Sequence, residues 1–213
     1  MTSYLQSWRT MPGAPRAMLL VLAAAVVLAN IHQPYPEIAP LQHVPTVLLI
    51  LAAPLLLARW PLSGGACGCV LAFLLLHTLA GRYIYSYVPY AQWLAALSGK
   101  EIATTTGRNG FDRLVHLGFG LLGAPVLIEI ARHHGGQSLR LACWHALLFV
   151  GAASALYEIF EWLLTMLVAP DMADAYNGQQ GDLWDAQKDM ALAMAGAALA
   201  CAGIVIRSRV ARR

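Results

Sequence analysis

Six long apolar stretches constrain this chain more strongly than any other feature of its sequence. They lie at about 15–31, 44–60, 66–82, 112–131, 139–168 and 185–206. Each is close to the roughly 20 residues that a helix needs to cross the hydrocarbon core of a bilayer. We therefore expect an all-α fold, a polytopic membrane bundle of about six transmembrane helices. The string AMAGAALACAG in the last stretch predicts a helix that packs closely against its neighbours, because small residues allow helices to approach.

The composition supports a membrane protein and excludes several other classes. Hydrophobic residues make up 59% of the chain and charged residues 12%, against about 25% charged in a soluble domain. No soluble domain or low-complexity linker interrupts the pattern, so residues 1–213 are expected to form a single integral-membrane domain. No basic patch interleaved with aromatic residues is present, so nucleic acid is excluded as a partner and the lipid bilayer is the expected one. Four cysteines lack the spacing of redox or zinc motifs and are expected to be inert packing thiols.

The lysine and arginine residues between the stretches predict the orientation. With the N-terminus inside, nine of them fall on the cytoplasmic side and five on the outer side. Short cytoplasmic loops carry the excess of positive charge in membrane proteins, so both termini are expected to be cytoplasmic. The first stretch follows Arg9 and Arg16 as a signal peptide would, but five more stretches follow it, and we expect it to be retained.

Ionisable side chains of four stretches reach one level of the membrane, near the outer leaflet in this orientation. Asp112 and His116 are four residues apart, and Glu158 and Glu161 are three apart, so each pair shares one face of its helix. The full set comprises His77 in the third stretch, Asp112, Arg113 and His116 in the fourth, Glu158 and Glu161 in the fifth, and Asp182, Asp185 and Asp189 at the sixth.

The number of acids makes a chance arrangement unfavourable. An acidic side chain at the bilayer centre costs on the order of 3 kcal/mol, and less near the interface. The acids must therefore be paired, protonated, hydrated or bound to a cation, and Arg113 and Lys188 can neutralise two of them. We interpret the set as the wall of a polar cavity that opens outward, with Arg82 and Tyr83 expected near its mouth.

A shell of histidine and carboxylate ligands suits a divalent metal, which is the candidate cofactor, although its identity is unknown. The expected metal ligands are His77, Asp112, His116, Asp182, Asp185 and Asp189. Glu158 or Glu161 is expected to act as a general base, and Arg113 to hold an anionic headgroup or an acid. This hypothesis describes a metal-assisted hydrolase that acts on a lipid or envelope substrate.

Two alternatives remain open at this point. The cavity can belong to a transporter, although the spans below it are almost wholly apolar, which disfavours a continuous pathway. The same residues can instead form a structural network of hydrogen bonds and ion pairs in a non-catalytic membrane scaffold.

Four motifs resemble the YjdF-like bacterial inner-membrane proteins, a family whose domain has no known function. They are HTLAGRYIYSYVP, RNGFDRLVHLGFGLLGAP, ALYEIFEW and GQQGDLWDAQKDMALAMAGA, in that order. The resemblance implies a multi-pass protein of the bacterial inner membrane and no particular activity. It marks as motif positions Asp112, Arg113, His116, Glu158, Glu161, Gln180, Asp182, Trp184, Asp185 and Asp189. A fainter similarity to VanZ-like membrane proteins rests on DRLVH and GDLWDAQKDMALAMAGA and hints at envelope or lipid-linked work.

Overall fold

The computed structural model describes residues 3–100, 107–168 and 179–211, and these residues form helices and no strands. The predicted all-α class is confirmed. The helices in chain order are α1 (Tyr4–Thr10), α2 (Gly13–Asn30), α3 (Ala39–Gln42), α4 (Val44–Arg59), α5 (Gly64–Arg82), α6 (Tyr90–Ser98), α7 (Phe111–His133), α8 (Leu139–Val168) and α10 (Asp185–Val210).

Six segments of the described residues are long and apolar enough to cross a membrane, as predicted. They are Gly13–Asn30, Ala39–Arg59, Gly64–Arg82, Phe111–His133, Leu139–Leu163 and Asp185–Val210. The second begins earlier than expected, because α3 runs into α4 through His43. The other differences amount to a few residues at the ends of helices.

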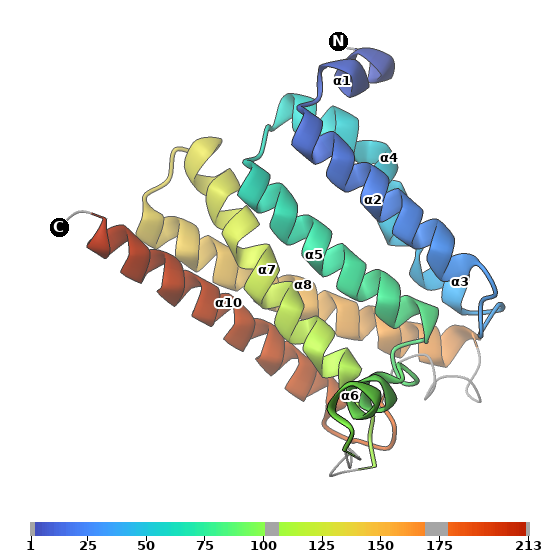
Figure 1. The fold of residues 1–213 in the computed structure, drawn as a ribbon. Helices are drawn as coiled ribbons and strands as arrows, with labels where there is room; N and C mark the ends of the chain where they lie inside the picture. Colours follow the sequence, from blue (N-terminus) through green and yellow to red (C-terminus); the bar gives the residue numbers. More distant parts are fainter. Residues whose placement is uncertain (1–2, 101–106, 169–178, 212–213) are drawn as a thin grey trace.

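The helices form two groups that meet where α5 packs against α7 (Figure 1). The first group contains α2, α4 and α5, and the second contains α7, α8 and α10. Buried small and medium side chains fill the second group, among them Ala124, Ala146, Val150, Ala193 and Ala197. This packing confirms the close approach predicted for the last span.

The crossing of α7 and α10 is the tightest in the bundle. A Cβ atom at Gly120 would overlap the carbonyl oxygen of Ala193, and one at Gly196 would overlap the carbonyl oxygen of Leu117. Glycine is therefore required on both helices, and the two backbones lie against each other. His116 lies one turn before Gly120 and Asp189 two turns before Gly196, so the crossing brings these side chains to the same region.

Hydrogen bonds join the helices of the first group at one end of the bundle. The Asn30 amide lies 2.9 Å from Nδ1 of His43, and Nε2 of His43 lies 3.1 Å from the Thr78 carbonyl oxygen. Arg82 donates to the carbonyl oxygens of Ala29 and Ile31, at 2.6 and 3.0 Å. The expectation that Arg82 lies near the cavity mouth stays a prediction, while its guanidinium satisfies carbonyls at the C-terminal end of α2.

The short helix α6 and the starts of α7 and α10 lie at one end of the bundle (Figure 1). Part of the aromatic-rich segment YIYSYVPYAQW forms the helix at this end. Tyr90 packs against Phe111, and its hydroxyl accepts a hydrogen bond from the backbone N–H of Gly110 at 3.2 Å. This contact connects α6 to the N-terminal end of α7.

Candidate functional site

The candidate site begins where two loops hold the N-terminal ends of α7 and α10 together. The Asn109 backbone N–H donates to Oε1 of Gln180 at 2.8 Å, and the Gln180 amide donates to the Asn109 carbonyl at 3.0 Å. The Asn109 side chain in turn accepts from the N–H of Phe111, the first residue of α7. These bonds fix the two helix ends, and each helix carries an aspartate in its first turn, Asp112 or Asp185, where the helix dipole favours a negative charge.

An outer tier of the site consists of acids paired with cations. Arg108 donates to Asp185, and Arg113 donates to Asp182. The Lys188 ammonium also contacts Asp182, at 2.6 and 2.9 Å from its two carboxyl oxygens. Two aspartates therefore meet three basic side chains, and this tier carries no excess of negative charge.

Asp182 lies before α10, outside the spans, and its pKa is held well below the usual range. The hydrogen bond from Lys188 is the main cause, and the Trp184 backbone N–H and Arg113 add to it. The carboxylate of Asp182 is therefore charged at neutral pH and forms a fixed anchor for two cations that come from different segments.

An inner tier lies deeper and consists of Asp112, His116 and Asp189. One ligand atom from each side chain lies within 4.8 Å of the other two. All three residues are buried, with exposed fractions of 5%, 8% and 2%. Glu158 of α8 joins this tier, since its Oε1 atom is 3.7 Å from Nε2 of His116. Side chains that are far apart in the sequence, from three helices, thus contribute to one polar centre.

The inner tier has more acids than its surroundings neutralise. Among the described residues, no lysine or arginine forms an ion pair with Asp112, Asp189 or Glu158. Oδ1 of Asp189 and Oε1 of Glu158 are buried and have no hydrogen-bond partner in this part of the chain. Burial of a polar atom without a partner costs roughly 1–3 kcal/mol, so such atoms are rare unless something else satisfies them.

The geometry of the inner tier suits a small divalent ion. Tetrahedral ligands with bonds of about 2.0–2.2 Å to one ion lie roughly 3.4 Å apart. The observed limit of 4.8 Å therefore requires the three ligand atoms to move together by about 1 Å. Histidine with carboxylates is a ligand set that zinc, manganese and iron accept.

The comparisons with known proteins agree with this architecture. A family model described as "Predicted membrane protein (DUF2238)" matches residues 14–209. The chain belongs to this family. The chain is also similar to the inner membrane protein YjdF of Escherichia coli (strain K12), with 33% identity over 159 residues, which cover 70% of each protein. No solved structure matches.

Membership of the DUF2238 family confirms the resemblance that the motifs indicated, while the VanZ-like similarity stays a prediction. The family assignment makes the chain a membrane protein but gives no activity. The motif residues Asp112, His116, Glu158, Asp185 and Asp189 nevertheless converge in the structure. Their convergence was the expectation on which the sequence interpretation depended.

His77 lies apart from the other predicted site residues, whereas Glu161 lies near the acids of the inner tier. Nε2 of His77 lies 3.0 Å from the Gln42 carbonyl oxygen, and the Tyr85 hydroxyl lies close to Nδ1. Because a carbonyl only accepts, Nε2 carries the proton and Nδ1 accepts from Tyr85, so both nitrogens are already engaged. Glu161 lies on α8 and shares a side-chain hydrogen bond with Tyr157. The structure does not bring His77 into the inner tier.

Sequence reasoning missed the role of two residues in the loop before α7. Arg108 was assigned only to the outer basic residues, and Asn109 was not singled out. Both come from a segment without helical periodicity, so spacing could not connect them with α10. The useful signal was the motif string itself, RNGFDRLVH, in which Arg108 and Asn109 directly precede the site-bearing helix.

Proposed function

We propose that this protein is a metal-dependent enzyme of the bacterial inner membrane, with both termini cytoplasmic and its site toward the outer leaflet. Asp112, His116 and Asp189 would bind one divalent ion. The observation that carries this proposal is the convergence of three buried ligand atoms, one of them from Asp189, whose Oδ1 atom has no hydrogen-bond partner among the described residues.

The chemistry proposed is hydrolysis of an ester or phosphoester. A divalent ion held by these three residues would polarise the bond that breaks and would activate a water molecule as the nucleophile. Glu158 would accept the proton of that water and return it to the leaving group, as a general base and then acid. Arg113 would hold the anionic part of the substrate, since its side chain is 30% exposed while it pairs with Asp182. In this proposal Asp182 and Asp185 hold basic side chains in position and do not bind the metal.

A membrane-resident substrate is supported by apolar side chains beside the site. Leu183 and Trp184 lie between Asp182 and Asp185 in the sequence, yet they are 92% and 64% exposed. Exposed Trp93 and Leu97 lie on α6, at the same end of the bundle (Figure 1). Tryptophan is enriched where the headgroups of a bilayer meet its hydrocarbon. The substrate proposed is therefore a lipid or lipid-linked envelope molecule with an anionic headgroup.

The competing function is a structural role in a scaffold, and the outer tier favours it. The pairs Arg108–Asp185 and Arg113–Asp182 fasten the loop before α7 to the segment at the start of α10. Transport has less support, because the core between α7, α8 and α10 beyond the inner tier is lined by alanine, valine, isoleucine and cysteine.

The deciding experiment is metal analysis of protein purified without chelators. We expect about one divalent ion per chain in the wild type, and loss of that ion in Asp189→Asn and in His116→Ala. Glu37→Gln and His145→Ala are matched controls, since both residues are exposed and lie outside the inner tier. Glu158→Gln should weaken metal binding by about 10–100-fold, as the loss of residues around metal ligands does.

Each possible result of this experiment has a clear reading. Wild-type protein without stoichiometric metal would remove the metal centre. A loss of stability in Asp189→Asn would then support the structural network, because removing one partner from a buried network destabilises the fold. A different result is protein that binds metal but releases no headgroup or acyl chain from vesicles of bacterial lipid in a chelator-sensitive way. That result would support the metal centre and contradict the hydrolase.

A further inference from the structure

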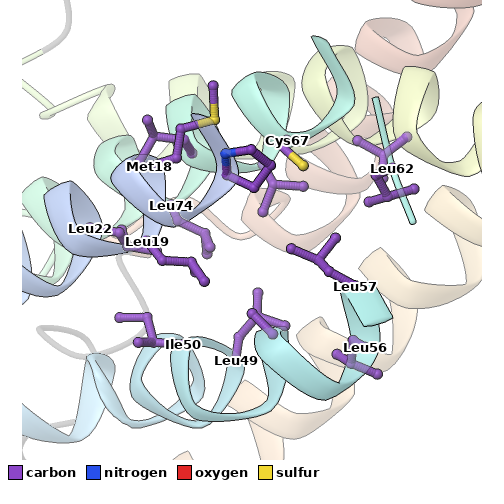
Figure 2. Close-up of a pocket in the computed structure, with 15 residues that line it drawn as sticks. Met18, Leu19, Leu22, Leu49, Ile50, Leu56, Leu57, Leu62, Cys67 and Leu74 are labelled. Carbon is purple, nitrogen blue, oxygen red and sulfur yellow. The ribbon is translucent and has the colours of Figure 1, made fainter. Parts of the chain in front are cut away.

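An apolar cavity lies between α2, α4 and α5, away from the metal site. Its volume is about 240 Å³, and its lining side chains contain only carbon and sulfur beyond the backbone. Figure 2 shows Leu19 and Leu22 of α2 facing Leu49 and Ile50 of α4 across this space. For comparison, an engineered apolar cavity of about 150 Å³ stays dry and binds benzene. The cavity therefore has room for a hydrocarbon ligand and no partner for water.

The position of the cavity relative to the spans narrows the class of ligand. Its lining runs from Pro15 to Leu22 on α2 and from Cys67 to Leu74 on α5, the halves of these helices that are remote from α6. These segments belong to candidate membrane spans. A ligand that enters here comes from the hydrocarbon of the bilayer, in the leaflet opposite the candidate metal site.

Two arginine residues near one end of the cavity favour a ligand with an anionic group. Arg16 directly follows Pro15, which lines the cavity, and Arg59 lies one turn or less beyond Leu56 and Leu57. Arg16 donates through Nη2 to the carbonyl oxygens of Arg9 and Met11, while its Nε is buried without a hydrogen-bond partner among the described residues. Arg59 lies over the ring of Trp60, 5.2 Å from its centroid. Nη1 of Arg16, which forms no hydrogen bond with the described residues, and the exposed Arg59 are thus the groups available to an anion.

We propose that this cavity holds one acyl chain of an anionic phospholipid, whose phosphate binds Arg16 and Arg59. The apolar lining accounts for the chain, and the two arginines account for the headgroup at the end of the cavity. The bound lipid completes the packing between α2 and α4. This site is separate from the proposed metal centre and does not depend on it.

Native mass spectrometry of protein purified from membranes in a mild detergent tests the proposal. We expect one phospholipid per chain to be retained, enriched in anionic headgroups over the membrane average. Ala53→Phe fills the cavity from α4, because Ala53 is buried and lines it, whereas Ala58→Phe adds the same ring on the exposed side of the same helix. If the phenylalanine ring displaces about two methylenes of the acyl chain, the lipid occupancy of Ala53→Phe should fall at least tenfold, by roughly the free energy of burying those groups.

A second experiment tests the headgroup preference and leaves the lining of the cavity unchanged. The double variant Arg16→Gln, Arg59→Gln should retain a lipid but lose the preference for phosphatidylglycerol over phosphatidylcholine of equal chain length. Thermal-shift titration of delipidated wild type with these two lipids gives a readout that does not depend on the folding of any variant. Greater stabilisation by phosphatidylglycerol than by phosphatidylcholine is the expected result.

Three outcomes would overturn the proposal. One is wild-type protein that retains no lipid and is stabilised equally by both lipids. Another is equal lipid retention by Ala53→Phe and Ala58→Phe. The third is a dimer that Ala53→Phe converts to a monomer, because a second copy of the chain would then be the occupant of the cavity.

Discussion

Asp182 and Asp189 lie seven residues apart and meet opposite surroundings. Asp182 receives Lys188 and Arg113, while Asp189 is buried and forms no ion pair with a lysine or arginine of the described residues. The same residue type therefore serves as an electrostatic anchor at one position and is available as a ligand at the other. Spacing alone made the two residues equivalent, and only their neighbours distinguish them.

The anchor role predicts a specific pH dependence for Asp182→Asn. The folded protein lowers the pKa of Asp182 below its ordinary 3.8, chiefly through Lys188, so its charge stabilises the fold above that pH. This contribution is lost as the pH falls through the lowered pKa of the folded state. We expect the variant to melt at a lower temperature than wild type at pH 7, and the difference to shrink below about pH 4. Thermal melting in detergent across this range measures it, and a constant difference would contradict the anchor role.

Histidine shows how far residue spacing can predict a site. Asp112 and His116 share a face by their spacing of four, and the structure brings both to the inner tier. His77 satisfied the same criterion of depth, but its partners are a main-chain carbonyl at Gln42 and the hydroxyl of Tyr85. Neither partner belongs to the span that carries His77, so no periodic pattern could have indicated them.

At the scale of elements, the crossing of α7 and α10 positions the inner tier. The two backbones touch at Gly120 and Gly196, and the ligands His116 and Asp189 extend from the turns that precede these contacts. Hydropathy predicted both helices to within a few residues, and the small residues predicted close packing. The relative rotation of the helices was not predictable, because it depends on which glycines meet.

Substitution at this crossing tests its role. Gly120→Ala or Gly196→Ala places a methyl group inside the neighbouring backbone, and we expect a destabilisation of about 1–3 kcal/mol or more, with weaker metal binding. Gly203→Ala on α10 is the matched control, because a Cβ there meets no atom within 4 Å. The control should be neutral or more stable by up to roughly 1 kcal/mol, since alanine favours the helix. Equal effects at Gly196 and Gly203, measured by chemical denaturation, would contradict this role.

For the whole molecule, hydropathy and charge predicted the six spans, but not the way in which they divide into two groups. The helix α1 and the C-terminal end of α10 lie at one end of the bundle, and α6 lies at the other end (Figure 1). The sequence could not predict this division, because the joining contacts, such as those of His43 and Arg82, run between residues far apart in the chain.

The proposed orientation makes a prediction for fusion reporters. Green fluorescent protein at the C-terminus should fluoresce, and alkaline phosphatase should be inactive there but active after Glu37, between the first two spans. The excess of arginine at the C-terminal side is the physical reason. Active phosphatase at the C-terminus would contradict this orientation and would place the proposed metal site in the cytoplasmic leaflet.

The hydrogen bonds of His43 and Arg82 have a mechanical consequence for the first group of helices. Within the described part of the chain, the side-chain hydrogen bonds that join α2, α4 and α5 to one another gather near Asn30 and Thr78. The opposite ends of these helices surround the apolar cavity without such bonds. We therefore expect the packing between α2 and α4 beside the cavity, which no such bond holds, to be the part of this group that separates when a hydrocarbon tail enters from the side.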